Sequence, residues 1–392
     1  MNILYVSHRY HTNQVPIMKG WADYGAKVTF LAQYEGVSEV HDYVDFYIMK
    51  PSLLTKCCNW FIDKKYNPSI AEGKKTKFFI PSLSHIYKIL KKEKPDLVIL
   101  REHLLCNMII WQICKVLHIK NVLMYTQIPL YGYKAQKHAL DCIAKRLFPK
   151  ICFTPILYNG NIRNKDKLSE GWFAPQWYVP LIVEVENSKP NQLKQNVIQL
   201  LDIGKYREYK NHFFLVDTLS KIKNISQFKL TIIGQLSQSA EEAYYNRLKE
   251  YIKEKKLTNY IELKKNVPFN QMNQIYENAN ILILPSKNES AGMVILESMA
   301  KGICVMSSNN CGLSSYLNEY NCGFVFSTSD NKLVDYLNQV EENPDLITEF
   351  GIKGKEVCIE HFSFKNYLHH LNNITTKHFS LNLFNQLEQH QK

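Results

Sequence analysis

The stretch from Ile281 to Gly302 reads ILILPSKNESAGMVILESMAKG. Its apolar, β-branched start stops at Pro285-Ser286, a polar loop follows from Lys287 to Gly292, and apolar residues then recur with helical spacing. The pattern predicts a strand, a loop and a helix. In open α/β sheets ligands collect outside the carboxyl ends of the strands, where helix N-terminal amides favour an anion. We therefore expect a ligand site at this loop.

Two carboxylates accompany this predicted anion site. Glu289 lies in the loop, and Glu297 follows about two turns into the helix. Carboxylates repel a phosphate but accept strong hydrogen bonds from sugar or ribose hydroxyls. Taken alone, this stretch favours the alternative that Glu289 is a solvated loop residue and Glu297 a charge on the helix surface.

The spacing of the two glutamates carries a family resemblance. Seven residues separate Glu289 from Glu297, and the two lie between a Pro-Ser pair and the sequence Met-Ala-Lys-Gly. This arrangement resembles the E-x7-E signature of retaining glycosyltransferases of family 4. The resemblance implies an α/β GT-B fold, in which two Rossmann-like doubly wound domains face a cleft and the C-terminal domain binds a nucleotide-sugar. In that family the second Glu binds the ribose hydroxyls and the first contacts the donor sugar. Ser290-Ala291 replace the usual Gly-Phe, so the donor sugar stays open.

A pair of lysines follows the strand predicted for Val197 to Ile203. Gly204, Lys205 and Lys210 match the family's G-R-x4-K pattern, with Lys205 in place of the arginine. The resemblance implies that both cations contact the donor's β-phosphate. Two ammonium groups would stabilise the charge that builds on a departing diphosphate. Without the E-x7-E motif, they would be ordinary surface lysines of a basic protein.

Further donor contacts are implied by the same resemblance. A glycine turn follows the strand Phe228 to Ile233, and the turn after the strand Tyr260 to Leu263 would lie against the nucleotide base. The start of the helix after Glu289 would supply amides to the diphosphate. The residues implied are Gly234, Asn266, Val267, Ser290, Gly292, Met293 and Val294.

The N-terminal half has the same alternation of strands and helices but fewer motifs. Strands are predicted at Ile3 to Ser7, Val28 to Ala32, Asp96 to Arg101 and Asn121 to Tyr125, and polar residues follow the first, third and fourth of them. His103 follows the third strand and is a candidate general base or phosphate contact. The alternative is that His103 is structural. The loop His8 to Gln14 is either an acceptor or phosphate contact or an ordinary connection.

Chain length predicts two domains. At 392 residues the chain exceeds the size at which a single core keeps growing. We place an N-terminal, acceptor-side domain at 1–185 and a nucleotide-sugar domain at 186–363, with the polar stretch Glu184 to Asn196 as linker. Family resemblance implies that the segment 364–392 packs back on the N-terminal domain.

The net charge of +12 is concentrated in one segment. From Lys50 to Lys94 eleven lysines face three acidic residues, a local excess of 11 − 3 = +8. Aromatic residues interleave with these lysines, which suits an anionic membrane surface or a nucleic acid; the alternative is a solvated loop.

No apolar run is long enough to span a membrane, and the N-terminus lacks a signal-peptide pattern. We expect a cytoplasmic protein with peripheral attachment at the inner face of the membrane.

Metal and cofactor motifs are lacking in the sequence. The ten cysteines form no C-x-x-C pair, and no D-x-D triplet occurs. Glycosyltransferases of the other large architecture commonly hold a divalent metal through D-x-D. We therefore predict a metal-independent reaction without a cofactor.

These observations predict a hexosyltransferase-type glycosyltransferase. It would move a sugar from a nucleotide-diphosphate sugar to a saccharide or lipid-linked acceptor, in surface polysaccharide biosynthesis. The alternative function is that of a nucleotide-sugar epimerase or a phosphorylase with the GT-B fold. A more remote alternative is a nucleic-acid-binding protein. Nucleic acid is disfavoured as a partner because Glu289 and Glu297 would repel its phosphates. A Rossmann dehydrogenase is also disfavoured, since no G-x-G-x-x-G occurs.

Overall fold

The computed structural model describes residues 1–36, 41–66, 68–130, 146–171, 174–185, 197–236 and 239–388. By its internal contacts the chain divides into two compact units. The first comprises Met1–Ile156, Asp166–Ile182 and Phe364–Lys392, and the second Leu157–Lys165 and Val183–Ser363. The second unit thus takes Leu157–Lys165 from the region that the sequence assigned to the first domain. Most of the predicted linker, 186–196, lies outside the described residues.

The first unit is built on a parallel sheet. Its strand order is β3-β2-β1-β4-β5-β6-β7, so the first strand lies inside the sheet and the order reverses between β1 and β4. This is the doubly wound pattern predicted from the sequence. The strands are β1 (Asn2–Ser7), β2 (Lys27–Ala32), β3 (Asp45–Ile48), β4 (Leu97–Arg101), β5 (Val122–Tyr125), β6 (Cys152–Thr154) and β7 (Gln176–Tyr178).

Helices cover both faces of this sheet. Trp21 of α1 and Leu371 of α14 belong to the core on one face, and Ile86 of α4 and Ile110 of α5 to the core on the other. Within the described residues the first unit has the helices α1 (Val15–Asp23), α2 (Leu53–Lys65), α3 (Pro68–Lys77), α4 (Leu83–Glu93), α5 (Leu105–Val116), α14 (Phe364–Phe379) and α15 (Leu383–Glu388).

The C-terminal helix α14 packs on α1 within the first unit. The rings of Phe364 and Trp21 meet edge to face, 5.2 Å apart. A Cβ at Gly20 would lie 2.0 Å from the Phe364 ring, so α1 needs glycine there for α14 to approach. The contact joins residues from opposite ends of the chain.

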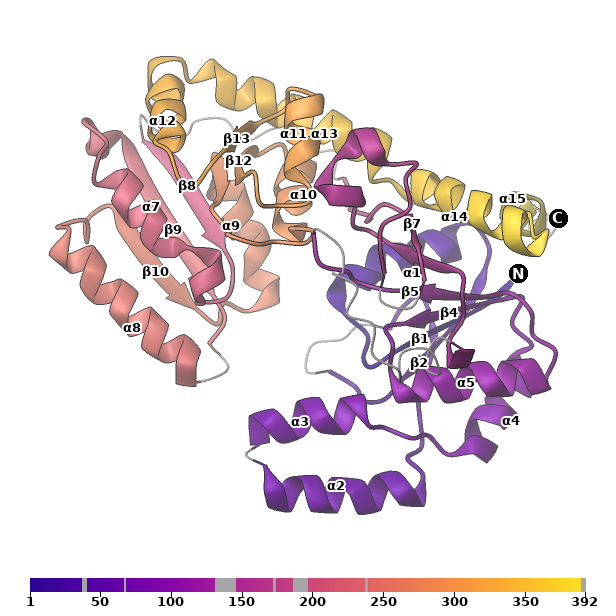
Figure 1. Cartoon of the computed structure of the whole chain (residues 1–392). Coiled ribbons are helices and arrows are strands. Elements are labelled where there is room, and N and C mark those ends of the chain that lie inside the picture. Colours follow the sequence, from indigo (N-terminus) through magenta and orange to yellow (C-terminus); the bar gives the residue numbers. More distant parts are fainter. Residues whose placement is uncertain are drawn as a thin grey trace. The chain divides into compact units, whose positions relative to one another are not determined.

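The lysine-rich segment is helical, which corrects the alternative that it is a solvated loop. Ser52 caps α2 by accepting a hydrogen bond from the backbone N–H of Thr55 at 3.2 Å. The segment continues through α3 and α4. In Figure 1, α2 and α3 lie side by side, apart from the strands of the sheet. No helix in the described ranges is both long and apolar enough to cross a membrane.

The second unit has a parallel sheet of order β10-β9-β8-β11-β12-β13. Its first strand, β8, lies in the middle beside the fourth, β11, so the order reverses between them. Ligands of doubly wound sheets bind at such a switch point. The strands are β8 (Ile198–Ile203), β9 (Phe228–Gly234), β10 (Ile261–Lys265), β11 (Ile281–Leu284), β12 (Cys304–Ser308) and β13 (Phe324–Phe326).

The helices of this unit follow its strands along the chain (Figure 1). Buried side chains of the strands, such as Leu200 and Ile283, join those of α7, α8 and α12 in one core. The helices are α7 (His212–Leu219), α8 (Ser239–Glu254), α9 (Met272–Asn278), α10 (Met293–Ala300), α11 (Ser314–Glu319), α12 (Lys332–Glu342) and α13 (Asp345–His361).

Candidate functional site

An ion pair lies at the switch point of the second sheet. Lys210 follows β8 in a 3-10 turn (Glu208–Lys210), and Glu289 follows β11, the neighbouring strand. The Lys210 ammonium donates to Oε2 of Glu289 at 2.5 Å. Their side chains are 11% and 21% exposed, so the pair is largely shielded from solvent but not fully buried. The structure thus brings together two of the predicted site residues.

Gly204 gives the Lys210 side chain its path to Glu289. A Cβ at Gly204 would lie 3.0 Å from both Cδ and Cε of Lys210, closer than nearly all real contacts of that kind. The loop after β8 is also tied to the loop after β11. Asn211, at φ +62°, donates from its side chain to the carbonyl of Pro285 at 3.2 Å. A glycine is therefore needed at position 204, because a side chain there would crowd the side chain of Lys210.

The backbone at Glu289 is fixed by the loop after β12. Its N–H donates to the carbonyl of Asn310 at 2.9 Å, and its carbonyl accepts from Gly312 N–H at 3.0 Å. Three residues further on, Gly292 is the N-cap of α10 at φ +84°, where a Cβ would lie 2.7 Å from the Cys311 sulfur. The direction of the Glu289 side chain is therefore set by rigid neighbours.

Glu297 has a different partner. The hydroxyl of Tyr276, on α9, donates to Oε2 of Glu297 at 2.5 Å. Burial raises the pKa of Tyr276 well above its usual value, and the Glu297 carboxylate adds to this effect, so the tyrosine stays a donor. Glu297 itself is half-buried. One of its oxygens is thus oriented by Tyr276, while no hydrogen bond from the described residues reaches the other oxygen, which can accept from a ligand.

Electrostatics keep the lysine charged. Burial by itself would lower the pKa of Lys210, but the adjacent Glu289 carboxylate outweighs burial and holds the pKa above its ordinary value. The Lys210 ammonium is therefore charged, and the Glu289 carboxylate is its ion-pair partner. A diphosphate, which carries more negative charge, could compete for that ammonium.

A second buried pair, which sequence reasoning missed, lies close to Lys210. Oδ2 of Asp202, on β8, is 3.3 Å from Nε2 of His212, and Nδ1 of His212 is 3.2 Å from the Tyr244 hydroxyl. Burial raises the pKa of Asp202 to about 7, against the opposing pull of Lys210. Burial, together with the nearby charge of Lys210, lowers the pKa of His212 to about 3. The signal in the sequence was an aspartate inside the apolar strand IQLLDI.

Lys205, the other predicted cation, does not join the pair. Its side chain is exposed, and the described residues offer it no ion pair or hydrogen bond. The structure therefore separates the two lysines into a fixed cation and a solvated one. The contact of Lys205 with a phosphate stays a prediction.

The other residues predicted to contact the donor also belong to the second unit. A Cβ at Gly234 would lie 2.6 Å from both the Gly204 carbonyl and the Tyr206 ring, so internal packing already requires glycine there. Asn266, at φ +51°, donates its N–H to Gly234 O at 3.0 Å and accepts from Leu236 N–H at 2.8 Å. These bonds shape the turn after β10. The other predicted residues are half-buried or, for Gly292, buried: Val267, Ser290, Gly292, Met293 and Val294.

His103 belongs to the first unit, at the carboxyl end of β4. Its ring lies edge to face against Phe148, 5.2 Å away, and burial lowers its pKa to about 4. The imidazole is therefore neutral near pH 7. Its role as base or phosphate contact stays a prediction.

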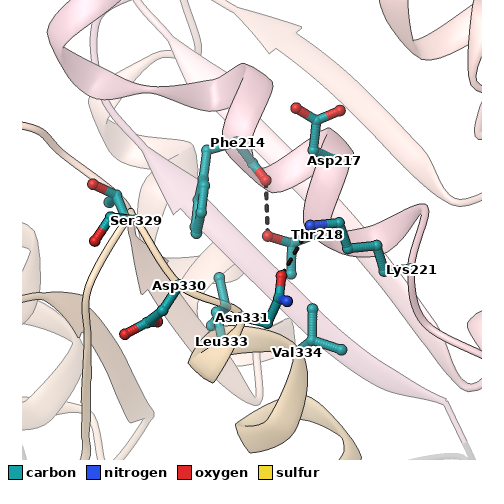
Figure 2. A pocket seen from close by; sticks show the side chains of 10 residues that line it. Phe214, Asp217, Thr218, Lys221, Ser329, Asp330, Asn331, Leu333 and Val334 are labelled. Carbon is teal, nitrogen blue, oxygen red and sulfur yellow. Dashed lines mark hydrogen bonds between the residues drawn. The ribbon is translucent and has the colours of Figure 1, made fainter.

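One hollow of the second unit is not lined by any of the predicted site residues. About 220 Å³ in volume, it lies between α7 and the loop before α12 (Figure 2). Lys221 Nζ donates across it to Asn331 Oδ1 at 2.9 Å, and Asp217 accepts from Tyr251 at 2.6 Å. Its charged groups are thus already partnered, and none of the predicted site residues lines it.

Metal-ligating clusters are also lacking from the described part of the chain. There, no three His, Cys, Asp or Glu side chains are grouped so that they could hold a metal ion. The nine cysteines within the described ranges are free thiols, most of them buried. The tenth, Cys142, lies outside those ranges.

Comparison with known proteins points to one group of enzymes. Residues 184–357, which carry the site, match the family model of "Glycosyl transferases group 1". A GDP-Man:Man(3)GlcNAc(2)-PP-Dol alpha-1,2-mannosyltransferase of Dictyostelium discoideum is 24% identical over 236 residues, 56% of this chain and 46% of that protein. The chain spans less than half the length of the curated relatives it matches.

Solved structures share the fold. A glycosyltransferase from Rickettsia africae ESF-5 has a TM-score of 0.69 at 18% identity, covering 96% of this chain and 98% of that one. HepE from Anabaena, solved in complex with UDP-glucose, has a TM-score of 0.65 at 12% identity, covering 97% and 100%. Together with the two doubly wound sheets, these structures confirm the predicted GT-B fold class.

Proposed function

We propose that the chain is a retaining glycosyltransferase of family 4 that takes its sugar from a nucleotide-diphosphate sugar. The observation that carries the proposal is the Lys210–Glu289 pair at the switch point of the second sheet. A charged lysine held by a single carboxylate suits a substrate that brings its own diphosphate. The match of residues 184–357 to group 1 glycosyl transferases supports this assignment.

Each of the two glutamates then accepts hydrogen bonds from hydroxyl groups of the donor. When the donor binds, Lys210 exchanges Glu289 for an oxygen of the β-phosphate. The released Glu289 carboxylate accepts from hydroxyls of the sugar. Glu297, oriented by Tyr276, accepts from the ribose hydroxyls.

The transfer itself is a displacement on one face of the sugar. The bond from the anomeric carbon to the phosphate oxygen breaks, and the bond to the acceptor oxygen forms on the same face. The acceptor's proton passes to the leaving phosphate oxygen. Lys210, Lys205 and the backbone amides of Gly292 and Met293 stabilise the departing diphosphate, so that no metal ion is required.

The acceptor class is also part of the proposal. We assign a saccharide or lipid-linked saccharide, because a relative that matches more than half of this chain carries a PP-Dol acceptor in its name. The corresponding process is surface polysaccharide biosynthesis. The donor base and sugar would be identified by experiment.

Ligand binding and product stereochemistry test the function. UDP, GDP and ADP are screened by thermal shift, since a ligand of the native state raises the unfolding temperature. The stabilising nucleotide's sugars are then incubated with and without a saccharide acceptor, and the anomeric configuration is read by NMR. We expect transfer only with acceptor, with the donor's configuration retained. Conversion of the donor alone would instead indicate an epimerase, phosphate-dependent cleavage a phosphorylase, and no stabilisation by any nucleotide would refute the proposal.

A further inference from the structure

We propose that the outer face of α2, α4 and α5 is a docking surface for an anionic lipid bilayer, with acyl chains entering the groove between α4 and α5. The proposal lies beyond the transfer reaction and concerns only the first unit. We call this surface the lipid face and define it by six exposed or groove-lining apolar residues: Leu53, Leu54, Leu83, Tyr87, Ile109 and Val116.

The groove is large and apolar. A hollow of about 710 Å³ lies between α4 and α5, lined by Leu83, Tyr87 and Val116 among others. A second hollow of about 690 Å³ lies at the start of α2 and shares Leu83 and Ile109 with the first. The two hollows therefore adjoin each other on the surface. Ligand sites of drug-sized molecules have comparable volumes.

Its apolar side chains are unusually exposed. Leu53 is 81% exposed, Val116 70%, Leu83 59% and Leu54 58%. Single exposed leucines are common on soluble proteins, but apolar residues gathered along a groove mark an interaction site. Transfer of such side chains out of water is favourable whatever apolar medium receives them.

Helix α2 contributes little to the core of its own unit. Among its described residues only Thr55 is buried, while Trp60 is 55% and Phe61 64% exposed. The Thr55 hydroxyl donates to Ile80 O at 2.7 Å and accepts from Ile80 N–H at 2.8 Å, which ties the base of the α2–α3 hairpin to the unit. Isolated helices of this length are marginal in water, so burial of an outer apolar side would stabilise α2.

The positive charge around the groove indicates that the apolar medium is an anionic bilayer. Lys88 and Lys91 line the groove, and Lys115 is exposed on α5 beside Val116. The acidic residues nearby are engaged: Asp63 pairs with Lys75 at 2.5 Å, and Glu93 is buried and accepts from Lys27 at 2.7 Å. The free charge of the described surface is thus positive, as a surface with anionic headgroups requires.

Two other occupants fit less well. A nucleic acid would be bound through stacking aromatic platforms, whereas the groove is lined mostly by aliphatic side chains. A second copy of the chain would place one lysine-rich face against another, which repels. A bilayer with anionic headgroups satisfies both the apolar groove and the lysines.

Vesicle binding tests the proposal without any sugar nucleotide. The full chain is mixed with phosphatidylcholine vesicles, with or without an equal share of phosphatidylglycerol, and the bound fraction is measured by flotation. We expect binding to the phosphatidylglycerol vesicles, much weaker binding to phosphatidylcholine alone, and a loss at ~0.5 M salt, where charges are screened within a few ångströms. The double variant L53E/V116E should partition at least tenfold more weakly. K88E/K91E should lose the preference for phosphatidylglycerol.

Matched controls come from the second unit. Ile359 on α13 is 56% exposed, so I359E adds charge to an exposed apolar site without touching the lipid face. K249E/K253E on α8 repeats the charge change of K88E/K91E at other exposed positions. Both controls should bind vesicles nearly as the unmodified chain does.

Three results would overturn the proposal: no binding of the unmodified chain to phosphatidylglycerol vesicles at low salt, equal binding by L53E/V116E and I359E, or a lipid-free dimer in sedimentation velocity that L53E/V116E abolishes. The last would assign the face to a second copy. Because no donor is present, each result leaves the proposed transferase activity standing.

Discussion

Lys210 and Glu289 are 79 positions apart in the chain, yet Nζ of one lies 2.5 Å from Oε2 of the other. The distance follows from topology, because β8 and β11 are neighbours and both loops leave the same edge of the sheet. It also has a functional consequence. The lysine that would stabilise a leaving diphosphate is already partnered, so a donor must replace one anion by another.

Removal of the cation should therefore be costly. Lys210→Met keeps most of the side-chain length and loses the charge, and we expect kcat to fall about 10²- to 10³-fold, the usual loss for one oxyanion-stabilising group. Lys205→Met, at an exposed lysine, should lower kcat by no more than about tenfold. Steady-state kinetics with a matched donor and acceptor measure both. Equal effects of the two substitutions would contradict the separate roles that we assign.

Glu289→Gln separates the ion pair from sugar binding. The variant releases Lys210 from its carboxylate, so a nucleoside diphosphate without sugar should bind at least as tightly as it does to the unmodified chain. Transfer should nevertheless slow, because a neutral amide oxygen accepts weaker hydrogen bonds from sugar hydroxyls than a carboxylate does. Isothermal calorimetry with the diphosphate and kinetics with the full donor give the two readings. A large loss of diphosphate affinity would show that Glu289 does not compete for Lys210.

Much of this site was predictable from local patterns. The strand-loop-helix reading of Ile281 to Gly302 matches β11 and α10, and the alternation of apolar runs located the other predicted strands within a few residues. Period and turn residues are local properties of a sequence. The residues on which the E-x7-E and lysine patterns rest lie in the unit that the family comparison also matches.

What escaped prediction depends on contacts distant in sequence. The partner of Glu297, Tyr276, is on another helix, and no spacing rule connects the two. The Asp202–His212 pair forms because α7 packs on β8, which only the fold reveals. Helices α2 and α3 were missed for a different reason. Lysine-rich segments with weak apolar periodicity look like loops until capping and packing are visible.

Tyr276→Phe tests the orientation of Glu297. The substitution removes one hydrogen bond to a charged acceptor, which typically contributes about 1.5–3 kcal/mol. If Glu297 binds the ribose hydroxyls, KM for the donor should rise roughly tenfold or more, with little change in kcat, because the ribose does not change charge during transfer. Glu297→Gln should give a larger rise in KM. A loss confined to kcat would exclude a purely binding role for this pair.

Asp202 should make stability fall as pH rises. Its pKa is raised by burial to about 7, from 3.8, so between these values the folded chain keeps a proton that the unfolded chain has lost. The folded state therefore loses stability across this window, by roughly 4 kcal/mol at about 1.4 kcal/mol for each pKa unit. His212 acts in the opposite sense, since its pKa is lowered and its contribution is lost as pH falls from 6.5 toward about 3. Asp202→Asn removes the first effect and leaves the second.

Urea unfolding of this variant across pH separates the two contributions. Relative to the unmodified chain, Asp202→Asn should gain stability progressively from pH 4 to pH 7 and show no further gain above about pH 8. The side chain of Asp202 is 1% exposed, so solvent screening should not mask the effect. Parallel stability curves of the two proteins over this range would mean that Asp202 stays ionised throughout.

Gly292→Ala tests whether the start of α10 holds the Glu289 loop. The residue has φ +84°, and an added Cβ would lie 2.7 Å from the Cys311 sulfur, so both backbone strain and a clash result. We expect a loss of about 1–3 kcal/mol in stability together with weaker binding of the diphosphate, since the helix amides would shift. Gly73→Ala is the matched control: apart from its chain neighbours and the backbone of helix α3 itself, no atom of the described residues lies within 4 Å of its Cβ position. That change should stabilise the chain by about 0.5–1 kcal/mol and leave diphosphate binding unchanged. Equal unfolding midpoints for both variants would show that Gly292 is not under strain.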